Sequence, residues 1–144
     1  MFVTQILNGK AHRGVLTIDP AAAVTDAVAE LAARRIGALV VSSDGRHAEG
    51  ILSERDIVRE LGREGPAALT RRVGEMMTRE LQTCAPGDGA EMILAAMTEG
   101  RFRHMPVAQD GALIGLVSLG DVVKARLSEV SMERDTLEAM VAGY

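Results

Sequence analysis

Two short segments of the chain place a serine hydroxyl and an aspartate carboxylate at the same spacing. Residues 50–56 read Gly-Ile-Leu-Ser-Glu-Arg-Asp, and residues 115–121 read Gly-Leu-Val-Ser-Leu-Gly-Asp. In a Ser-x-x-Asp pair at the start of a helix, the hydroxyl and the carboxylate can satisfy free backbone amides as a variant of the capping box. A capping role is therefore one interpretation of both segments.

The second interpretation is a nucleotide-binding site. A helix N-terminus presents unpaired N–H groups and the positive end of the helix dipole, and both suit a phosphate. The hydroxyl of Ser53 or Ser118 can add one hydrogen bond to a phosphate oxygen. The carboxylate of Asp56 or Asp121 can accept hydrogen bonds from the vicinal hydroxyls of a ribose, and the glycine that begins each segment would let a ring approach the backbone. Two such motifs in equivalent places favour a ligand more strongly than one alone.

Both segments belong to a longer internal repeat. A shift of 66 residues places residues 17–20, Thr-Ile-Asp-Pro, on residues 83–86, Thr-Cys-Ala-Pro, and places the Asp-Gly pair at 44–45 on the pair at 110–111. One extra residue in the first copy then reduces the shift to 65, which superimposes the two Ser-x-x-Asp segments. Because chance matches do not hold one register over such a stretch, we infer a duplication.

Each copy predicts the element order β-α-β-β-α. A short extended segment that ends at a proline comes first, because proline disfavours the helical conformation at the residue before it. Apolar residues at helical spacing follow, and then two short apolar runs around an Asp-Gly turn predict buried strands. Asp88 can cap the helix of the second copy, whereas the first copy offers only Ala22 or Ala23. The predicted strands cover residues 17–18, 38–41 and 50–52 in the first copy and 82–84, 105–107 and 113–117 in the second.

Two copies packed together are the smallest stable unit, because a single copy buries too little surface. We predict an N-terminal lead at residues 1–14, a first repeat at 15–62, a linker at 63–76, a second repeat at 77–127 and a C-terminal helical tail at 128–144. The tail carries an apolar stripe that Arg134 interrupts. This stripe either packs on the body or forms a homodimer contact, and we predict the homodimer. Its residues are Leu127, Val130, Leu137 and Val141.

The composition of the 144 residues excludes several classes of protein. A net charge of −4 and only three aromatic residues, two Phe and one Tyr, argue against nucleic acid as the main partner. The single cysteine, Cys84, excludes an internal disulfide and a four-cysteine zinc site. No apolar run approaches the roughly 18 residues that span a bilayer, and the N-terminus lacks the features of a signal peptide. We therefore predict a cytoplasmic protein without a membrane partner.

Nothing in the sequence supplies a catalytic centre. It contains no G-x-S-x-G, no H-E-x-x-H and no Walker loop. The histidines at positions 12, 47 and 104 do not have the spacing of metal ligands, and we place His12 and His47 at the surface. Cys84 is predicted to be a small buried residue. We predict no catalysis, no catalytic cofactor and no bound metal.

Together, these features resemble a tandem pair of cystathionine β-synthase (CBS) domains. The resemblance rests on the two Ser-x-x-Asp segments, on residues 36–41, Ile-Gly-Ala-Leu-Val-Val, on residues 101–107, Arg-Phe-Arg-His-Met-Pro-Val, and on Met-Met-Thr at 76–78. It covers residues 15–127. It implies an α/β fold of α+β character, with two β-α-β-β-α repeats related by pseudo-two-fold symmetry, flanked by helices and separated by two clefts. Members of this family commonly bind adenosine-containing ligands in the clefts, and many form dimers.

The resemblance implies ligand-binding roles residue by residue. Asp56 and Asp121 match the aspartate that holds the ribose hydroxyls. Ser53 and Ser118 match the hydroxyl residue near the ribose and the phosphate. The remaining matches are Thr17 and Thr83 close to the nucleoside, Ile36, Gly37, Ala38, Met105 and Pro106 around the adenine edge, and Arg103 and His104 at the phosphate.

The two clefts are not expected to be equivalent. Where the second copy has Arg103 and His104, the first copy has Gly37 and Ala38. Arg55, inside the first Ser-x-x-Asp segment, can also reach a phosphate, whereas the second segment has a glycine at that place. The clefts therefore differ in the cations that they offer to a ligand.

We predict a non-catalytic sensor that binds AMP, ADP or ATP, or else NAD(H), in the cleft between the repeats. Ligand binding would change the conformation or the dimer packing and so regulate a separate effector protein, whose identity the sequence does not give. S-adenosylmethionine is a further ligand that family members bind. The alternative is a ligand-free dimeric scaffold for protein interactions. Replacing Asp56 or Asp121 distinguishes the two, because a cap alone would lose stability without any change in ligand binding.

Overall fold

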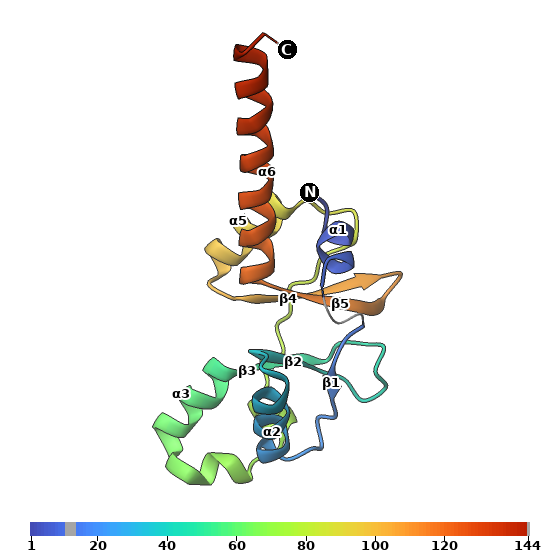
Figure 1. Ribbon diagram of the computed structural model, residues 1–144. Helices are drawn as coiled ribbons and strands as arrows, with labels where there is room; N and C mark the ends of the chain where they lie inside the picture. The colour runs from blue at the N-terminus through green and yellow to red at the C-terminus, as the bar shows by residue number, and fades with distance from the viewer. Residues whose placement is uncertain (11–13, 144) are drawn as a thin grey trace.

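The computed structural model describes residues 1–10 and 14–143, so His12, predicted at the surface, lies outside the described residues. The first repeat consists of β1 (Thr17–Ile18), α2 (Val24–Arg34), β2 (Ala38–Val41), β3 (Gly50–Ser53) and α3 (Glu54–Glu64). The second consists of α5 (Ala90–Gly100), β4 (His104–Gln109), β5 (Ala112–Ser118) and α6 (Leu119–Val141). Helix α1 (Val3–Asn8) precedes the first repeat, and the 3₁₀ helix η1 (Gly65–Thr70) and helix α4 (Val73–Met76) precede the second (Figure 1).

The strands form one small sheet in each repeat. The first repeat has three strands in the order β1-β2-β3, and the second has the hairpin β4-β5. β1 is parallel to β2, and the other pairs are antiparallel. The leading strand of the second repeat is reduced to one parallel bridge between Cys84 and Val107. This mixture of strands and helices confirms the predicted α+β class with two repeats.

Equivalent backbone positions end the helices and turn the hairpins in both repeats. Helices α2 and α5 each end at an arginine in the left-handed conformation, Arg35 with φ 54° and Arg101 with φ 55°. In the second hairpin Asp110 and Gly111 both have positive φ, as a two-residue type I′ turn requires. In the first hairpin Gly45 has φ 75°. These shared local features support the duplication that the sequence indicates.

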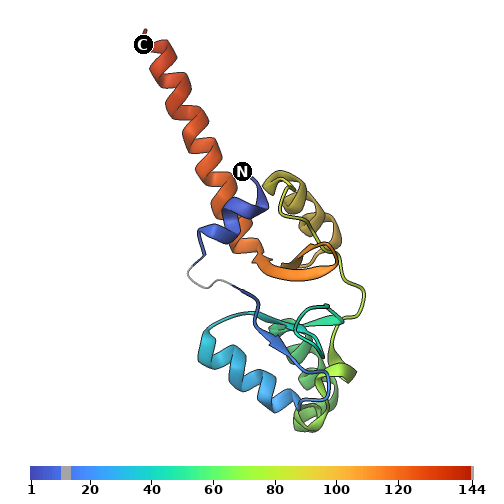
Figure 2. The ribbon, with the colours of Figure 1, turned by 90° about the vertical axis from the view of Figure 1, so that its right-hand side faces the viewer.

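Each repeat encloses its own hydrophobic core, and the helix that precedes the other repeat completes it. The first core gathers buried side chains of α2, β2 and β3 around Val73 and Met76 of α4. The second core gathers side chains of α5, β4, β5 and α6 around Val3 and Ile6 of α1. Both views of the ribbon show the blue α1 beside the orange elements of the second repeat (Figures 1 and 2). We call α1 and α4 the leading helices.

The crossing of the leading helices uses the same hydrogen bond twice. The N–H of Val3 donates to the carbonyl of Asp88 at 2.9 Å, and the N–H of Val73 donates to the carbonyl of Ala22 at 2.9 Å. The segments predicted as lead and linker therefore contribute directly to the two cores. The crossing also ties the repeats together, because α1 comes before the first repeat in the chain but packs in the core of the second.

Helix α6 is longer than its counterpart α3, with 23 residues against 11, and it projects from the body (Figure 2). Val122 and Ala125 near its start are buried in the second core. Further along, its large apolar side chains are exposed, namely Leu127, Val130, Met132, Leu137, Met140 and Val141. The boundary predicted between residues 127 and 128 falls within this one helix. Within residues 1–10 and 14–143, we find no helix with the length and apolar character to cross a membrane.

Candidate functional site

Both Ser-x-x-Asp segments form a capping box. At the start of α3, the N–H of Ser53 donates to Asp56 Oδ2 at 2.9 Å and the N–H of Asp56 donates to Ser53 Oγ at 3.3 Å. At the start of α6, the same two bonds between Ser118 and Asp121 measure 2.9 and 3.1 Å. The capping interpretation is therefore confirmed in both repeats. Each box uses one carboxylate oxygen and leaves the other for further partners.

Most amides at these helix starts are already bound. The N–H of Glu54 donates to the carbonyl of Gly37 at 2.9 Å, and the N–H of Leu119 donates to the carbonyl of Arg103 at 2.7 Å. The serine hydroxyl takes the amide of the third helical residue. Within the described part of the chain, the amide of the second helical residue has no partner in either helix. The number of N–H groups that each predicted phosphate-binding helix start can offer to a ligand is therefore one.

The glycine that begins each segment accommodates side chains of a leading helix or of the residue that follows it. A Cβ atom on Gly115 would lie 2.6 Å from Leu7 Cδ2, and a Cβ atom on Gly50 would lie 2.5 Å from Met77 Sδ. Leu7 belongs to α1, and Met77 directly follows α4. Side chains of the leading helices fill the space that a Cβ would need at either glycine, and the approach of a ligand ring to the backbone there stays a prediction.

One cavity between the repeats, which we call the Asp121 cleft, has a volume of about 640 Å³. Ser118 and Asp121 line it from the second repeat, and residues 36–38 line it from the first. Its apolar wall includes Leu7, Val15, Leu16, Ile114 and Leu116. This volume lies within the range of roughly 300–1,000 Å³ that is usual for small-molecule sites.

Lys10 lies on the carboxylate of Asp121. Its Nζ donates to Asp121 Oδ2 at 2.8 Å and to the carbonyl of Leu116 at 2.9 Å. Burial raises the pKa of Asp121, but the hydrogen bonds from Lys10 and from Ser118 outweigh burial and hold that pKa below its ordinary value. The side chain is 25% exposed. Oδ1 has no hydrogen-bond partner among residues 1–10 and 14–143, so this oxygen is available to a ligand.

The second cavity, which we call the Asp56 cleft, has a volume of about 670 Å³. Residues 53–56 line it from the first repeat, and residues 101–104 line it from the second. The structure thereby brings the predicted phosphate-binding residues Arg55, Arg103 and His104 to the same cleft as Asp56. The two clefts are thus built alike, each from the Ser-x-x-Asp segment of one repeat and the strand start of the other.

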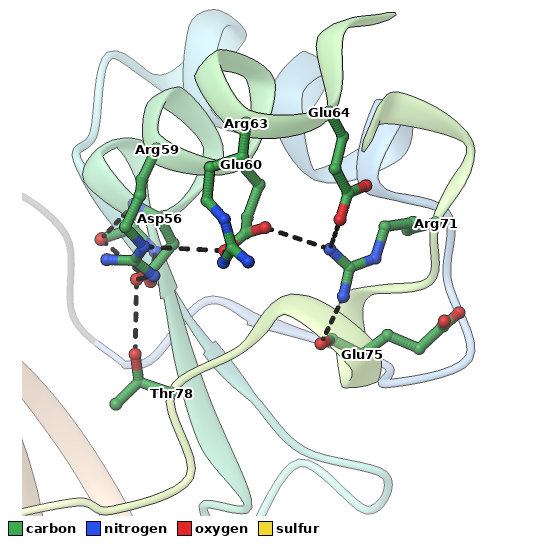
Figure 3. A network of polar contacts seen from close by, with 9 residues as sticks. Asp56, Arg59, Glu60, Arg63, Glu64, Arg71, Glu75 and Thr78 are labelled. Carbon is green, nitrogen blue, oxygen red and sulfur yellow. Dashed lines mark hydrogen bonds and ion pairs between the residues drawn. The ribbon is translucent and has the colours of Figure 1, made fainter. Parts of the chain in front are cut away.

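Both oxygens of the Asp56 carboxylate are bound within the protein (Figure 3). Oδ1 accepts from Arg59 Nη2 at 2.9 Å and from Thr78 Oγ1 at 3.4 Å. Oδ2 accepts from the N–H and the hydroxyl of Ser53 at 2.9 and 3.0 Å. The Asp56 side chain is only 7% exposed.

These contacts continue along α3 to the segment before the second repeat. Glu60 pairs with Arg59 at 3.6 Å and with Arg71 at 3.3 Å. Arg71 also pairs with Glu64 at 2.9 Å and donates to the carbonyl of Glu75 at 3.0 Å. Figure 3 shows this chain of polar contacts, which we call the α3 network. The network connects α3 to the segment around η1 and α4. The Asp56 carboxylate is therefore bound to side chains that hold these elements together.

His104 and Gly37 form a wall that both clefts share. A Cβ atom on Gly37 would lie 2.9 Å from Glu54 Oε1 and 3.2 Å from His104 Cε1, so glycine permits the close approach of these groups. Burial lowers the pKa of His104; the negative charge of Glu54 opposes this effect, and the positive charge of Lys10 adds to it. Burial thus disfavours the protonated form of the His104 ring, whose neutral form can still serve as a hydrogen-bonding group.

The structure brings most of the predicted site residues to the two clefts. Ile36, Gly37, Ala38, Ser118 and Asp121 line the Asp121 cleft, and Ser53, Arg55, Asp56, Arg103 and His104 line the Asp56 cleft. Four predicted residues, Thr17, Thr83, Met105 and Pro106, are not among the described residues that line either cleft. Leu16 and Gln82, each one residue earlier than a predicted threonine, line the clefts instead. Side chains alternate along an extended chain, so neighbouring residues face opposite ways.

Three residues whose side chains bind the two carboxylates were not among the site residues predicted from the sequence. Arg59 follows Asp56 by three residues, and the helical i, i+3 spacing is a signal that could have identified it. Lys10 and Thr78 reach the carboxylates because each lies just after a leading helix. No local pattern in the sequence indicates that the leading helices cross between the repeats.

Comparison with protein families and curated proteins gives one consistent result. The family model described as CBS domain matches residues 3–63 and 73–128, so both matches begin at a leading helix. The CBS domain-containing protein CBSX3, mitochondrial, of Arabidopsis thaliana is 38% identical over 124 residues, which are 83% of this chain and 60% of that protein. The matches to two further Arabidopsis relatives cover 21% and 24% of their lengths.

Solved structures share the arrangement of both repeats. The CBS-domain containing protein ATU1752 from Agrobacterium tumefaciens has a TM-score of 0.83 and 39% identity, covering 88% of this chain and 99% of that one. The crystal structure of CBSX2 in complex with AMP has a TM-score of 0.71 and 25% identity, covering 88% and 96% of the two chains. A neighbour of this fold is thus known with an adenosine nucleotide bound.

Proposed function

Because this chain belongs to the CBS domain family, we propose that it is a non-catalytic regulatory module that binds an adenosine-containing ligand in the Asp121 cleft. One observation carries the proposal: the Ser118–Asp121 pair of one repeat and residues 36–38 of the other line the same cavity. A ligand in this cavity contacts both repeats. Its binding therefore favours whichever packing of the repeats offers it the better contacts.

AMP suits the chemistry of this cleft. Asp121 Oδ1 can accept a hydrogen bond from a ribose hydroxyl, and the Ser118 hydroxyl can donate to a phosphate oxygen. Ile36 and Leu16 offer aliphatic surface to an adenine ring. The complex of CBSX2 with AMP supports this choice. ADP, ATP, NAD(H) and S-adenosylmethionine contain the same adenosine group and are the other candidates.

We infer that the Asp56 cleft binds nucleotide more weakly. Its arginines, Arg55 and Arg103 among them, suit an anionic group. A ribose on Asp56, however, must displace Arg59 or Thr78, because both carboxylate oxygens are already bound. The cost of this displacement is absent for Oδ1 of Asp121.

We also propose that the projecting part of α6 pairs with a second copy of the chain. Five of the exposed apolar residues of α6 form one stripe, namely Val123, Leu127, Val130, Leu137 and Val141. They follow the alternating spacing of four and three residues of a coiled-coil seam, with Arg134 at the one interrupted position. An antiparallel copy would set Lys124 opposite Glu138, so this pair of charges beside the seam is complementary.

Light scattering of the purified protein tests this pairing. We expect a mass twice that of the 15.3 kDa chain, and a monomer after the double substitution Leu127→Glu and Leu137→Glu. A monomeric wild-type protein would contradict the pairing.

Two further statements stay predictions: that the module regulates a separate effector protein, and that it resides in the cytoplasm.

Thermal unfolding of the purified chain with AMP, ADP, ATP, NAD, NADH or S-adenosylmethionine tests the ligand-binding function. A ligand at about 100 times its dissociation constant adds roughly 2.7 kcal/mol to the free energy of unfolding. We expect at least one ligand to raise Tm by several degrees, and Asp121→Asn to remove the rise while keeping an acceptor for the N–H of Ser118. If none of the six raises Tm, the ligand-free dimeric scaffold is the better account.

A further inference from the structure

The position of Lys10 sets a condition on any ribose that binds to Asp121. Its Nζ lies 2.8 Å from Asp121 Oδ2 and 2.9 Å from the carbonyl of Leu116, and its side chain is 31% exposed. Oδ2 also accepts the N–H of Ser118 at 2.9 Å. A ribose that presents both vicinal hydroxyls to the carboxylate needs both oxygens, so one of its hydroxyls competes with the Lys10 ammonium.

Displacing Lys10 has a different cost for neutral and for anionic ligands. An ammonium that leaves a carboxylate in a partly buried cleft loses a charge-assisted hydrogen bond. A neutral nucleoside offers no anion in exchange. A nucleotide carries a phosphate, and the flexible four-carbon stem of lysine allows the ammonium to move from Asp121 to that phosphate. The same residue therefore opposes a nucleoside and assists a nucleotide.

We propose that Lys10 makes the Asp121 cleft selective for phosphorylated adenosine ligands over neutral adenosine. This inference rests on the proposed function, since it concerns the same cleft. Among the described residues that line the cleft, the charged cations are Lys10 and Arg35, and Lys10 is the one that contacts Asp121. Lys124 is exposed on α6 and is not among the residues that line either cleft, so it serves as a control for a general effect of positive charge.

Calorimetric titration of the full chain with AMP and with adenosine tests the proposal. The quantity of interest is the ratio of the two affinities, measured for the wild type and for Lys10→Met, Lys10→Arg and Lys124→Met. We expect Lys10→Met to lower the AMP-to-adenosine ratio roughly tenfold, by weakening AMP and strengthening adenosine. Lys10→Arg should keep most of the ratio, and Lys124→Met should leave it within about twofold. Melting temperatures show whether each variant is folded.

The outcomes separate this proposal from the one on which it rests. If the wild type binds AMP but Lys10→Met leaves the ratio unchanged, Lys10 does not select the phosphate and only this inference is overturned. The same holds if Lys124→Met lowers the ratio as much as Lys10→Met does. If the wild type binds neither AMP nor adenosine, the proposed function itself is contradicted, and this inference with it.

A spectroscopic readout is available because the chain contains only two lysines, Lys10 and Lys124. In protein labelled with ¹³C-lysine, each lysine gives its own Cε signal, and Lys124 on α6 provides an internal reference. We expect AMP to shift the Lys10 signal and to leave the Lys124 signal in place. An AMP-saturated protein in which the Lys10 signal has not moved would overturn the proposal.

Discussion

The two clefts are built from the same Ser-x-x-Asp segment, but their carboxylates have different surroundings. Asp56 is 7% exposed, and both of its oxygens are bound by Ser53, Arg59 and Thr78. Asp121 is 25% exposed, and its Oδ1 is unbound within the described part of the chain. The capping box is present in both repeats because the fold needs it at the start of both helices. A carboxylate accessible to a ligand is present in only one of them.

The cations that bind the two carboxylates also come from different places. Arg59 lies one turn after Asp56 on the same helix, and Glu60 and Arg71 connect it to the segment before the second repeat. Lys10 comes from the segment after α1, far from Asp121 in the chain, and has no acidic partner besides Asp121 among the described residues. The difference indicates that Asp56 mainly supports the fold, whereas Asp121 can exchange its partner for a ligand.

The largest expected effect is on ligand affinity. Asp121→Ala removes the acceptor for the ribose hydroxyls, and we expect it to weaken AMP binding by about 100-fold, since bonds to charged groups are strong. Asp56→Ala is the matched variant and should change the AMP affinity by no more than about threefold. Calorimetric titration measures both. An Asp56→Ala protein that loses AMP as completely as Asp121→Ala does would reverse our assignment of the clefts.

For the free energy of unfolding, we expect the opposite ranking, with the larger loss in Asp56→Ala. Asp56→Ala breaks a buried ion pair and a cap, and we expect a loss of about 3 kcal/mol in the free energy of unfolding, with the exposure of Arg59 limiting the loss. Asp121→Ala removes mainly a cap and should cost about 1 kcal/mol. Urea unfolding curves give both values. Equal losses would show that the α3 network does not distinguish the two aspartates.

A smaller difference is expected between the two glycines that begin the segments. A Cβ on Gly50 would lie 2.9 Å from the backbone carbonyl of Thr78, whereas the nearest atoms to a Cβ on Gly115 all belong to the Leu7 side chain. A side chain moves more easily than a backbone, so Gly50→Ala should cost about 2 kcal/mol and Gly115→Ala about 1 kcal/mol. Thermal unfolding compares them. Should Gly115→Ala prove the more costly of the two, the contacts of the leading helices would not be equivalent.

The smallest expected effect is a pH dependence that the clefts share through His104. Burial holds its pKa below 6.5, with the charges of Lys10 and Arg103 adding to the decrease and those of Glu54 and Asp121 opposing it. The unfolded chain therefore binds more protons at this residue below pH 6.5. Stability from this source is complete above pH 6.5 and decreases as the pH falls through the pKa of the folded state. His104→Gln should flatten this decrease in unfolding curves between pH 7 and pH 5, and a slope that persists would assign it to other groups.

Much of the fold could be predicted from local patterns. The β-α-β-β-α order, the Asp-Gly turns and the two capping boxes follow from hydrophobic periodicity and short-range chemistry, which the sequence displays directly. The prediction that Asp88 caps α5 is wrong, because a segment distant in the sequence binds the start of this helix. The first N–H of α5, at Ala90, donates to the carbonyl of Met1, while Asp88 Oδ2 accepts the N–H of Ala85.

The candidate site was predictable only in part, for a related reason. The pattern of Ser118 and Asp121 indicates a ribose and phosphate site, but Lys10 is more than 100 residues away and reaches Asp121 because α1 packs in the second core. Apolar positions show which face of α1 is buried without showing which core receives it. The roles proposed for Gly50 and Gly115 needed the same information, since leading-helix side chains occupy the space above them.

A crystal structure of the protein with AMP tests the central claim most directly. We expect AMP in the Asp121 cleft, with a ribose hydroxyl within hydrogen-bond distance of the Asp121 carboxylate and the adenine against residues 36–38. The Asp56 carboxylate should keep Arg59 and Thr78 as its partners. AMP bound only on Asp56, with Arg59 displaced and Lys10 still on Asp121, would contradict the account.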